Sequence, residues 1–262
     1  MIIEQIWTGN NGRNFFYMVA CAESGEAAAI DPIDPKKCLD LAKARGWDIT
    51  QVINTHEHGD HIGGNDQVVA ATGARVIVPA NSSGRMPNYD GELSEGDTVK
   101  VGRTAEFEVL FTPGHTPIHI SLLGHTDRPH LLCGDTMFNA GVGNCNSGDP
   151  ETLYETFATK IAGLPDDTLI YPGHEYLANN LGFTLDREPD NADARALVAK
   201  AEAQDPDHAM ITDLGLERKI NTFLRLDSPL VIEALRAKFP DLPAKPDPKT
   251  VFIRLRALRN NW

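Results

Sequence analysis

The chain has 262 residues, 41% of them hydrophobic, and carries a formal net charge of -13. This length and apolar content suit a compact enzyme of one large domain, or of a main domain with an appendage. The negative charge argues against nucleic acid as a partner, because lysine and arginine are needed to neutralise its phosphates. No apolar run approaches the roughly 20 residues of a membrane span, so no membrane partner is expected.

The amino terminus and the cysteines both favour the cytoplasm. Residues 1–5 lack a basic segment followed by a long apolar stretch, so a secretory signal is not expected. The four cysteines show no CxxC spacing and are expected to be reduced thiols rather than a disulfide framework. The sequence gives no indication of the oligomeric state.

The first two thirds of the chain alternate predicted strands with predicted helices. The strands are expected at residues 15–19, 27–30, 49–53, 75–78, around 99, and at 107–111, 118–123, 131–133 and 169–171. The helices are expected at 36–45, 61–71 and 150–161. After residue 174 the pattern becomes all-helical, most clearly at 192–204 and 230–239. This change of class predicts a mixed α/β domain at 1–173 and a helical domain at 174–262.

The heptapeptide Thr-His-Glu-His-Gly-Asp-His holds four potential metal ligands. In an extended segment, side chains two residues apart point the same way, so His56 and His58 can bind one ion together. Asp60 and His61 follow a glycine at which the chain can turn, and they can serve a second ion. A loop that is histidine-rich by chance is the alternative. Three of the nine histidines fall in this one segment, which favours a metal site.

Three more potential ligands follow turns near the ends of predicted strands. His115 lies in Thr-Pro-Gly-His-Thr, Asp135 in Cys-Gly-Asp-Thr and His174 in Tyr-Pro-Gly-His-Glu. Loops at strand ends commonly carry functional residues on a rigid scaffold. Together, the seven ligands in four segments resemble the metallo-β-lactamase-fold hydrolases, whose pattern is HxHxDH followed by His, Asp and His.

The resemblance implies an αββα sandwich that binds two divalent metal ions. Carried over position by position, the ligands are His56, His58 and His115 for one ion, Asp60, His61 and His174 for the other, and Asp135 as the bridge. Zinc is the expected metal, with iron or manganese as alternatives, because sites of histidine and aspartate accept all three.

Further motifs narrow the resemblance to the hydroxyacylglutathione hydrolases, the glyoxalase II family, along nearly the whole chain. These motifs lie at residues 84–87, 134–138, 173–176, 179–183, 188–191 and 221–225. They imply that the helical domain at 174–262 binds the substrate.

The reaction implied by the resemblance is hydrolysis of S-(2-hydroxyacyl)glutathione to glutathione and a 2-hydroxy acid. Two ions lower the pKa of a bridging water toward neutrality and so provide hydroxide, with Asp60 and Asp135 as the catalytic carboxylates at the ions. A thioester suits such a site because its thiolate leaves without strong acid assistance. The alternatives are a persulfide dioxygenase that uses one iron, and a lactonase or other metallo-hydrolase of the same fold.

The substrate-binding positions only partly match the family. Tyr176 and Arg259 match family residues that contact glutathione. Where the family carries a cation and then an aromatic residue, this chain has Asn144 and Asn146, and Trp262 stands at the place of a lysine. Losing two cations from an anion-binding groove removes a few kcal/mol of binding when both contacts are charge-assisted. We therefore expect weaker binding of an anionic thioester than is usual for the family.

The basic tail and its neighbourhood offer an alternative source of positive charge, namely Arg225, Arg254 or Arg256.

Other residues have simpler interpretations. Asp31 matches a family aspartate that supports the metal loop by hydrogen bonding, with a plain turn aspartate as the alternative. Glu57 is expected to be solvated, because it points opposite to its histidine neighbours. His119 is expected to be a packed or hydrogen-bonded histidine on a strand, and His130 to be exposed in a polar loop. Cys145 is expected to be a loop thiol rather than a nucleophile.

Overall fold

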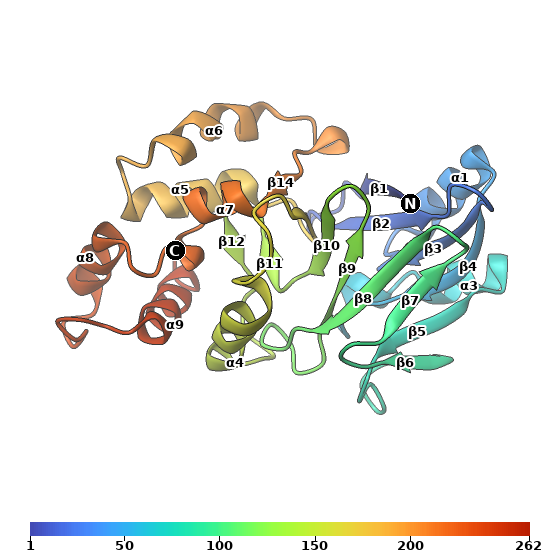
Figure 1. The fold of residues 1–262 in the computed structure, drawn as a ribbon, viewed down its shortest axis with the longest axis horizontal. Coiled ribbons are helices and arrows are strands. Elements are labelled where there is room, and N and C mark those ends of the chain that lie inside the picture. The colour runs from blue at the N-terminus through green and yellow to red at the C-terminus, as the bar shows by residue number, and fades with distance from the viewer. The chain divides into compact units, whose positions relative to one another are not determined.

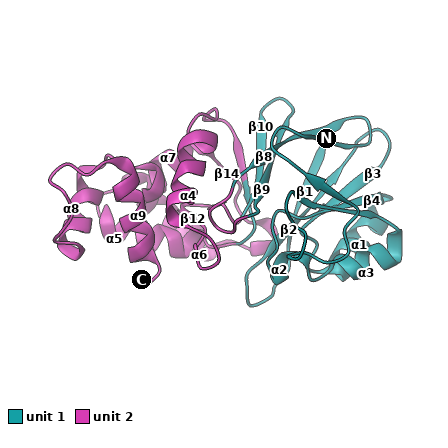
Figure 2. Cartoon of the chain, turned by 90° about the horizontal axis from the view of Figure 1, so that it is seen from below, with its two compact units in different colours: residues 1–112, 118–134, 171–174 teal, residues 113–117, 135–170, 175–262 magenta.

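The computed structural model describes all 262 residues and contains two compact units (Figure 2). Unit 1 comprises residues 1–112, 118–134 and 171–174, and unit 2 comprises residues 113–117, 135–170 and 175–262. The units interleave along the chain, whereas the predicted domains 1–173 and 174–262 are continuous. The domain division stays a prediction.

The first sheet of unit 1 has six strands in sequence order (Figure 1). They are β1 Ile2–Trp7, β2 Phe15–Ala20, β3 Glu26–Ile30, β4 Asp48–Ile53, β5 Arg75–Pro79 and β6 Gly91–Leu93. β1, β2 and β3 are antiparallel, and β3 to β6 are parallel. Every residue of β2 is buried, as expected for a strand whose two faces are both covered.

Three helices belong to the same unit: α1 Pro35–Arg45, α2 Gly59–Ile62 and α3 Asn65–Thr72. The Asp34 side chain accepts a hydrogen bond from the Lys37 amide and caps α1, and Gly46 ends the helix with a φ of 68°. Buried Cys38 of α1 and Val68 of α3 join the β2 side chains in one apolar core. These helices thus cover one face of the first sheet.

The single helix predicted at 61–71 is wrong, because α2 and α3 are separate helices. A Cβ at Gly64, between them, would lie 1.9 Å from the Pro32 carbonyl oxygen. Only glycine permits this close approach of two backbone segments.

Unit 1 also contains four antiparallel strands of the second six-stranded sheet, namely β7 Thr98–Val101, β8 Ala105–Phe111, β9 Ile120–His125 and β10 Pro129–Gly134. The predicted exposure of His130 in a loop is wrong. His130 lies within β10, where its ring nitrogens contact the Tyr171 hydroxyl at 3.1 Å and the Thr126 hydroxyl at 2.9 Å. Partial burial lowers the pKa of this imidazole.

Unit 2 is mostly helical. Its helices are α4 Pro150–Thr156, continued by the π-helix η1 Phe157–Ile161, then α5 Leu177–Arg187, α6 Ala192–Ala203, η2 Pro206–His208, α7 Leu214–Ile220, η3 Thr222–Leu224, α8 Pro229–Lys238 and α9 Pro248–Arg259. A short hairpin of β11 Met137–Phe138 and β12 Gly141–Val142 precedes them. No helix of the chain is both long enough and apolar enough to cross a membrane.

The expectation that the chain is all-helical after residue 174 is wrong at one place. The two-residue strand β14 Thr212–Asp213 pairs antiparallel with Leu169 and Ile170 of β13 Leu169–Pro172. A two-residue strand is too short to produce an alternating hydrophobic pattern, so the sequence carries no signal for it.

Candidate metal centre and substrate pocket

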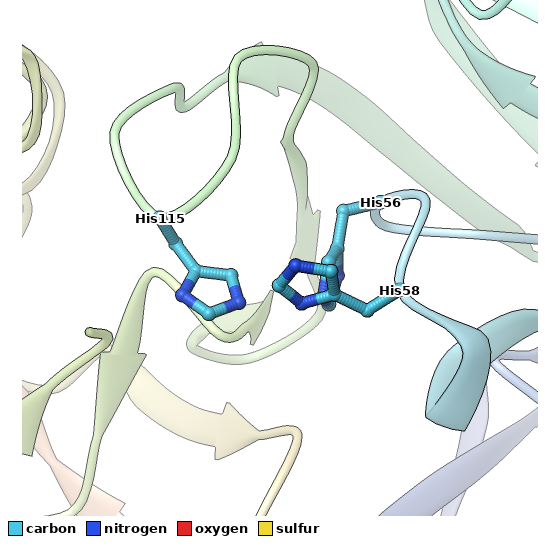
Figure 3. Close-up of side chains that lie close together, drawn as sticks. All are labelled: His56, His58 and His115. Carbon is cyan, nitrogen blue, oxygen red and sulfur yellow. The ribbon is translucent and has the colours of Figure 1, made fainter. Parts of the chain in front are cut away.

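The loop after β4 carries the first two predicted ligands. The His56 ring is buried, and its Nε2 lies 3.1 Å from the Nδ1 of His58 (Figure 3). Two nitrogens about 2.0–2.1 Å from one zinc ion at a tetrahedral angle are separated by about 3.3–3.4 Å. The spacing of these two imidazoles therefore suits a shared ion, as the alternating sequence positions predict.

A second group of ligands lies at the start of α2, also within unit 1. The Asp60 Oδ2 lies 3.9 Å from the Nε2 of His61 and 3.5 Å from the Nε2 of His174. The three ligand atoms lie within 4.8 Å of one another. The structure thus brings together the three residues that were predicted to hold the second ion.

Hydrogen bonds at the far side of each ring orient these histidines. The Nδ1 of His61 lies 2.9 Å from Asp31 Oδ2, and the Nδ1 of His174 lies 2.6 Å from the Gly12 carbonyl oxygen. An Nδ1–H that donates to oxygen leaves the lone pair on Nε2, which is the atom that faces Asp60 in both rings. The donor set therefore fits a divalent metal ion.

Asp31 supports this loop in the way expected from its match to the family. Its carboxylate accepts hydrogen bonds from the Thr55 amide at 2.8 Å and from the Thr55 hydroxyl at 2.6 Å, in addition to His61. The backbone of Asp31 has a φ of 53°, in the left-handed region. The Asn54 side-chain amide donates a fourth hydrogen bond to the carboxylate at 3.4 Å. With these partners, Asp31 orients the metal ligands rather than acting as one, although it lies within ligand distance of His56 and His61.

The interpretation of Glu57 as solvated is wrong. Its side chain is only 13% exposed, and it forms an ion pair with Arg85, whose Nη1 lies 3.4 Å from Glu57 Oε1. His119, by contrast, is confirmed as a packed, hydrogen-bonded histidine. It is buried just before β9, bonds to the Thr112 hydroxyl at 2.9 Å and stacks on the His56 ring.

Unit 2 carries the two remaining predicted ligands, His115 and Asp135, and both are buried. His115 comes from the loop at 113–117 and is drawn in Figure 3. Its Nδ1 lies 2.7 Å from the carbonyl oxygen of Asn144, and its Nε2 lies 3.5 Å from Asp135 Oδ2. The same arrangement recurs: an oxygen fixes Nδ1, and Nε2 faces a carboxylate.

A pocket of about 250 Å³ lies within unit 2 and contains all four predicted substrate-binding residues. It is lined by Phe138, Val142, Asn144, Asn146, Tyr176, Asn180, Arg256, Arg259 and Asn260. Arg259 reaches the Asn180 side-chain oxygen at 3.4 Å, and burial lowers the pKa of its guanidinium. The four residues predicted to bind the substrate therefore line one cavity.

Sequence reasoning gave little weight to one residue of this pocket. Arg256 was one of three alternatives for the missing charge, and of those three it alone lines the cavity. The signal was available, because Arg256 and Arg259 are spaced at i and i+3 and so share one face of α9.

A buried carboxylate holds the hairpin that forms part of the pocket. Glu217 of α7 accepts hydrogen bonds from the Ala140 amide at 2.8 Å and from the Thr212 hydroxyl at 2.7 Å. Ala140 occupies the hairpin turn with a φ of 57°. Burial raises the pKa of Glu217 to about 7, against the opposing effect of these hydrogen bonds.

Cys145 is confirmed as a loop thiol. It is only partly exposed, and burial raises its pKa to about 11, so it remains protonated at neutral pH and is a poor nucleophile.

The fold and the groups of metal-ligating side chains together indicate one fold class. Residues 21–174 match the family model of the metallo-beta-lactamase superfamily. The structure of ETHE1 from Myxococcus xanthus has a TM-score of 0.68 over 99% of this chain and 98% of that chain, at 24% sequence identity, and this likeness supports the fold. The chain has the metallo-β-lactamase fold.

The rest of the chain and its relatives identify the family. Residues 175–262 match the family model of the hydroxyacylglutathione hydrolase C-terminus. The chain is 56% identical to a hydroxyacylglutathione hydrolase of Nitrosococcus oceani and 57% identical to one of Polaromonas sp., in both cases over 100% of each chain. The chain belongs to the hydroxyacylglutathione hydrolase family.

Proposed function

We propose that this chain, as a metal-dependent thioester hydrolase of the hydroxyacylglutathione hydrolase family, cleaves S-(2-hydroxyacyl)glutathione to glutathione and a 2-hydroxy acid. The observation that carries the proposal is the full-length similarity to curated members, at 56% identity over the whole chain. It includes the C-terminal segment that distinguishes this family within the superfamily. The groups of histidine and aspartate described above support it.

The proposed ligands of the two ions are the seven residues of the motif: His56, His58 and His115 for one, Asp60, His61 and His174 for the other, and Asp135 as the bridge. When bound, two divalent ions polarise the substrate carbonyl and acidify water. Zinc is the proposed metal, since imidazole nitrogen and carboxylate oxygen are both good zinc ligands.

The protein's own groups prepare these ligands. Asp31 and the Gly12 carbonyl fix the tautomers of His61 and His174, so each presents Nε2 without rearrangement. The Asn144 carbonyl does the same for His115. Because Asn144 also lines the pocket, one short loop both orients a ligand and forms a wall of the proposed substrate site.

In the proposed complex the pocket of unit 2 holds the glutathionyl part of the substrate. The Tyr176 ring packs edge-on against Phe138, with ring centroids 5.2 Å apart, and forms one wall. Arg259 supplies positive charge for a substrate carboxylate, while Asn144 and Asn146 present amides suited to peptide groups. Holding the non-reacting part of a substrate in this way positions its thioester for reaction.

The proposal is tested by metal analysis and an activity screen on the same purified sample. Two ions per chain and turnover of S-D-lactoylglutathione are expected, with little activity on lactones or glutathione persulfide. His61→Gln should lose metal and turnover, whereas His208→Gln, which changes an exposed histidine of η2, should retain both. Turnover of lactones alone, or full thioesterase activity in His61→Gln, would contradict the proposal.

A further inference from the structure

Asn14 lies next to the second group of ligands and is fully buried. It directly precedes β2 and forms an isolated antiparallel bridge with His174, and the Phe15 amide donates to the Gly173 carbonyl oxygen at 2.8 Å. A loop near the amino terminus therefore reaches Asp60 and His174, two ligands of unit 1 that are 46 and 160 residues further along the chain.

The Asn14 side-chain amide is directed at Asp60. Its nitrogen Nδ2 donates to Asp60 Oδ2 at 3.1 Å and to the Asp60 carbonyl oxygen at 3.1 Å. The same nitrogen lies 3.4 Å from His174 Nε2, which is a longer contact. An amide nitrogen carries two hydrogens, so the two shorter contacts to Asp60 use both of them.

A neighbouring asparagine fixes the orientation of this amide. The Asn10 side-chain nitrogen donates to Asn14 Oδ1 at 2.9 Å, and the Asn14 backbone amide donates to Asn10 Oδ1 at 3.1 Å. With its side chain turned over, Asn14 would place its oxygen against the carboxylate and carbonyl oxygens of Asp60, and its NH₂ against the NH₂ of Asn10. Both contacts would be repulsive, so Asn14 presents its donor to Asp60.

Asp60 is the member of its group that needs such support. Its side chain is 46% exposed, whereas those of His61 and His174 are 1% and 5% exposed. A carboxylate turns readily about its last bond, so an exposed one can offer either oxygen. The oxygen that Asn14 holds is Oδ2, the atom that faces the Nε2 atoms of both histidines at 3.9 and 3.5 Å. A carboxylate oxygen has two lone pairs, so Oδ2 can accept from Asn14 and still bind an ion.

Each of the three ligands in this group thus has a supporting partner. The two histidines are oriented by Asp31 and by the Gly12 carbonyl oxygen, through hydrogen bonds to their Nδ1 atoms. Asn14 is the corresponding partner of Asp60. Partners of this kind orient a ligand before an ion arrives.

We propose that Asn14 is a positioning residue for the second metal ion, and that its amide holds the Asp60 carboxylate with Oδ2 toward the two histidine ligands. This ion is the one assigned above to Asp60, His61 and His174, and the inference rests on the proposed function only in that assignment. A carboxylate that is already oriented loses little conformational freedom when it binds an ion, so Asn14 raises the affinity of the site for metal. Asn14 is not itself a ligand, because its oxygen is turned toward Asn10.

The test measures zinc release from the loaded protein in competition with a chelator. Asn14→Ala should release one of its two ions at a chelator concentration about 10–100-fold lower than the unaltered protein does, the range for loss of a supporting partner. The other ion should be weakened less. Asn11→Ala is the matched control, because it removes an exposed amide from the same loop and should leave both ions unchanged. Should Asn14→Ala not fold, Asn14→Ser, whose hydroxyl ends one bond short of the amide nitrogen, is measured in its place.

A second substitution separates support of the ligand from support of the loop, because Asn14 also donates to the Asp60 carbonyl oxygen. Asp60→Ala removes the carboxylate and keeps that carbonyl. In equilibrium dialysis against zinc, Asn14→Ala should therefore cause no further loss of affinity in the Asp60→Ala background. A further loss of the same size there, or equal weakening of both ions in the single variant, would show a structural role and overturn the inference.

The inference and the proposed function can fail separately. Two ions and thioester turnover in the unaltered protein, with unchanged zinc release from Asn14→Ala, would overturn the role of Asn14 and leave the hydrolase intact. Selective loss of one ion from Asn14→Ala, in a protein that binds two ions and cleaves no thioester, would support the role of Asn14 and refute the hydrolase.

Discussion

Replacing Asp31 by asparagine tests how the structure prepares the metal ligands. Asparagine has nearly the same shape and tolerates the left-handed backbone, where Asp31 has a φ of 53°. Its oxygen can still accept from the Thr55 amide, and its NH₂ can donate to the Thr55 hydroxyl. The same NH₂ would, however, face the Nδ1 of His61, which lies 2.9 Å from the carboxylate oxygen.

Two donors cannot face each other, so His61 must shift its proton to Nε2 or rotate. Either change removes the lone pair from the atom that faces Asp60. Loss of such a supporting partner typically lowers metal affinity by about 10–100-fold, which is about 1.4–2.7 kcal/mol. The effect should be larger for the ion held by Asp60, His61 and His174, because His61 contacts Asp31 directly, whereas His56 is linked to it only through the Thr55 hydroxyl.

The assay is competition of the loaded protein with a chelator, followed by metal analysis. Compared with the unaltered protein, Asp31→Asn should release one of its two ions at a chelator concentration about 10–100-fold lower. Asp34→Asn is the control, because asparagine also caps a helix and Asp34 caps α1. Unchanged release of both ions from Asp31→Asn would refute the reasoning.

Three further changes test other parts of the structure. Asp135→Ala should lower metal content and activity together, measured on one sample; retention of two ions would show that Asp135 is not the bridge. For Glu217, burial raises the pKa from 4.5 to about 7, so its contribution to the free energy of unfolding is fully present below pH 4.5 and is lost as pH rises through 7. Relative to Glu217→Gln, the unaltered protein should lose about 3 kcal/mol across this interval in denaturant titrations, and a pH-independent difference would contradict the assignment. Asn144→Lys should lower KM for S-D-lactoylglutathione, with a gain that shrinks in salt, and an unchanged KM would indicate that Arg256 already satisfies the substrate.

Much of the metal loop could be predicted from sequence because its geometry is local. The spacing of His56 and His58 fixes which way their side chains point, and the distance between their nitrogens agrees with it. The C-terminal end of α1 was likewise predicted correctly at Arg45, since Gly46 acts on the nearest turn. Ligand spacing and helix capping depend only on residues a few positions apart in the sequence.

The features that sequence reasoning missed depend on distant partners. Glu57 was expected to be solvated from its direction on the loop, but its side chain is only 13% exposed and pairs with Arg85, 28 residues away. The glycine at position 64, between α2 and α3, is required because the Pro32 carbonyl leaves no room for a side chain there. Thr212 forms a strand only because it pairs with Ile170. None of these contacts produces a periodic pattern of hydrophobic residues in the sequence.

The family and its fold followed from motifs, whereas the source of charge in the pocket required the structure. The sequence does not distinguish among the three arginines Arg225, Arg254 and Arg256. Their contacts in the structure do. Two of the three are paired with carboxylates, and the third is buried beside a cavity.

The most direct test of the account follows S-D-lactoylglutathione cleavage and oxygen uptake on one sample of known metal content. The account predicts thioester hydrolysis without oxygen consumption, two metal ions per chain, and loss of turnover when a chelator removes them, with recovery on adding zinc. Oxygen consumption with glutathione persulfide and an intact thioester, in a protein holding one iron, would contradict it.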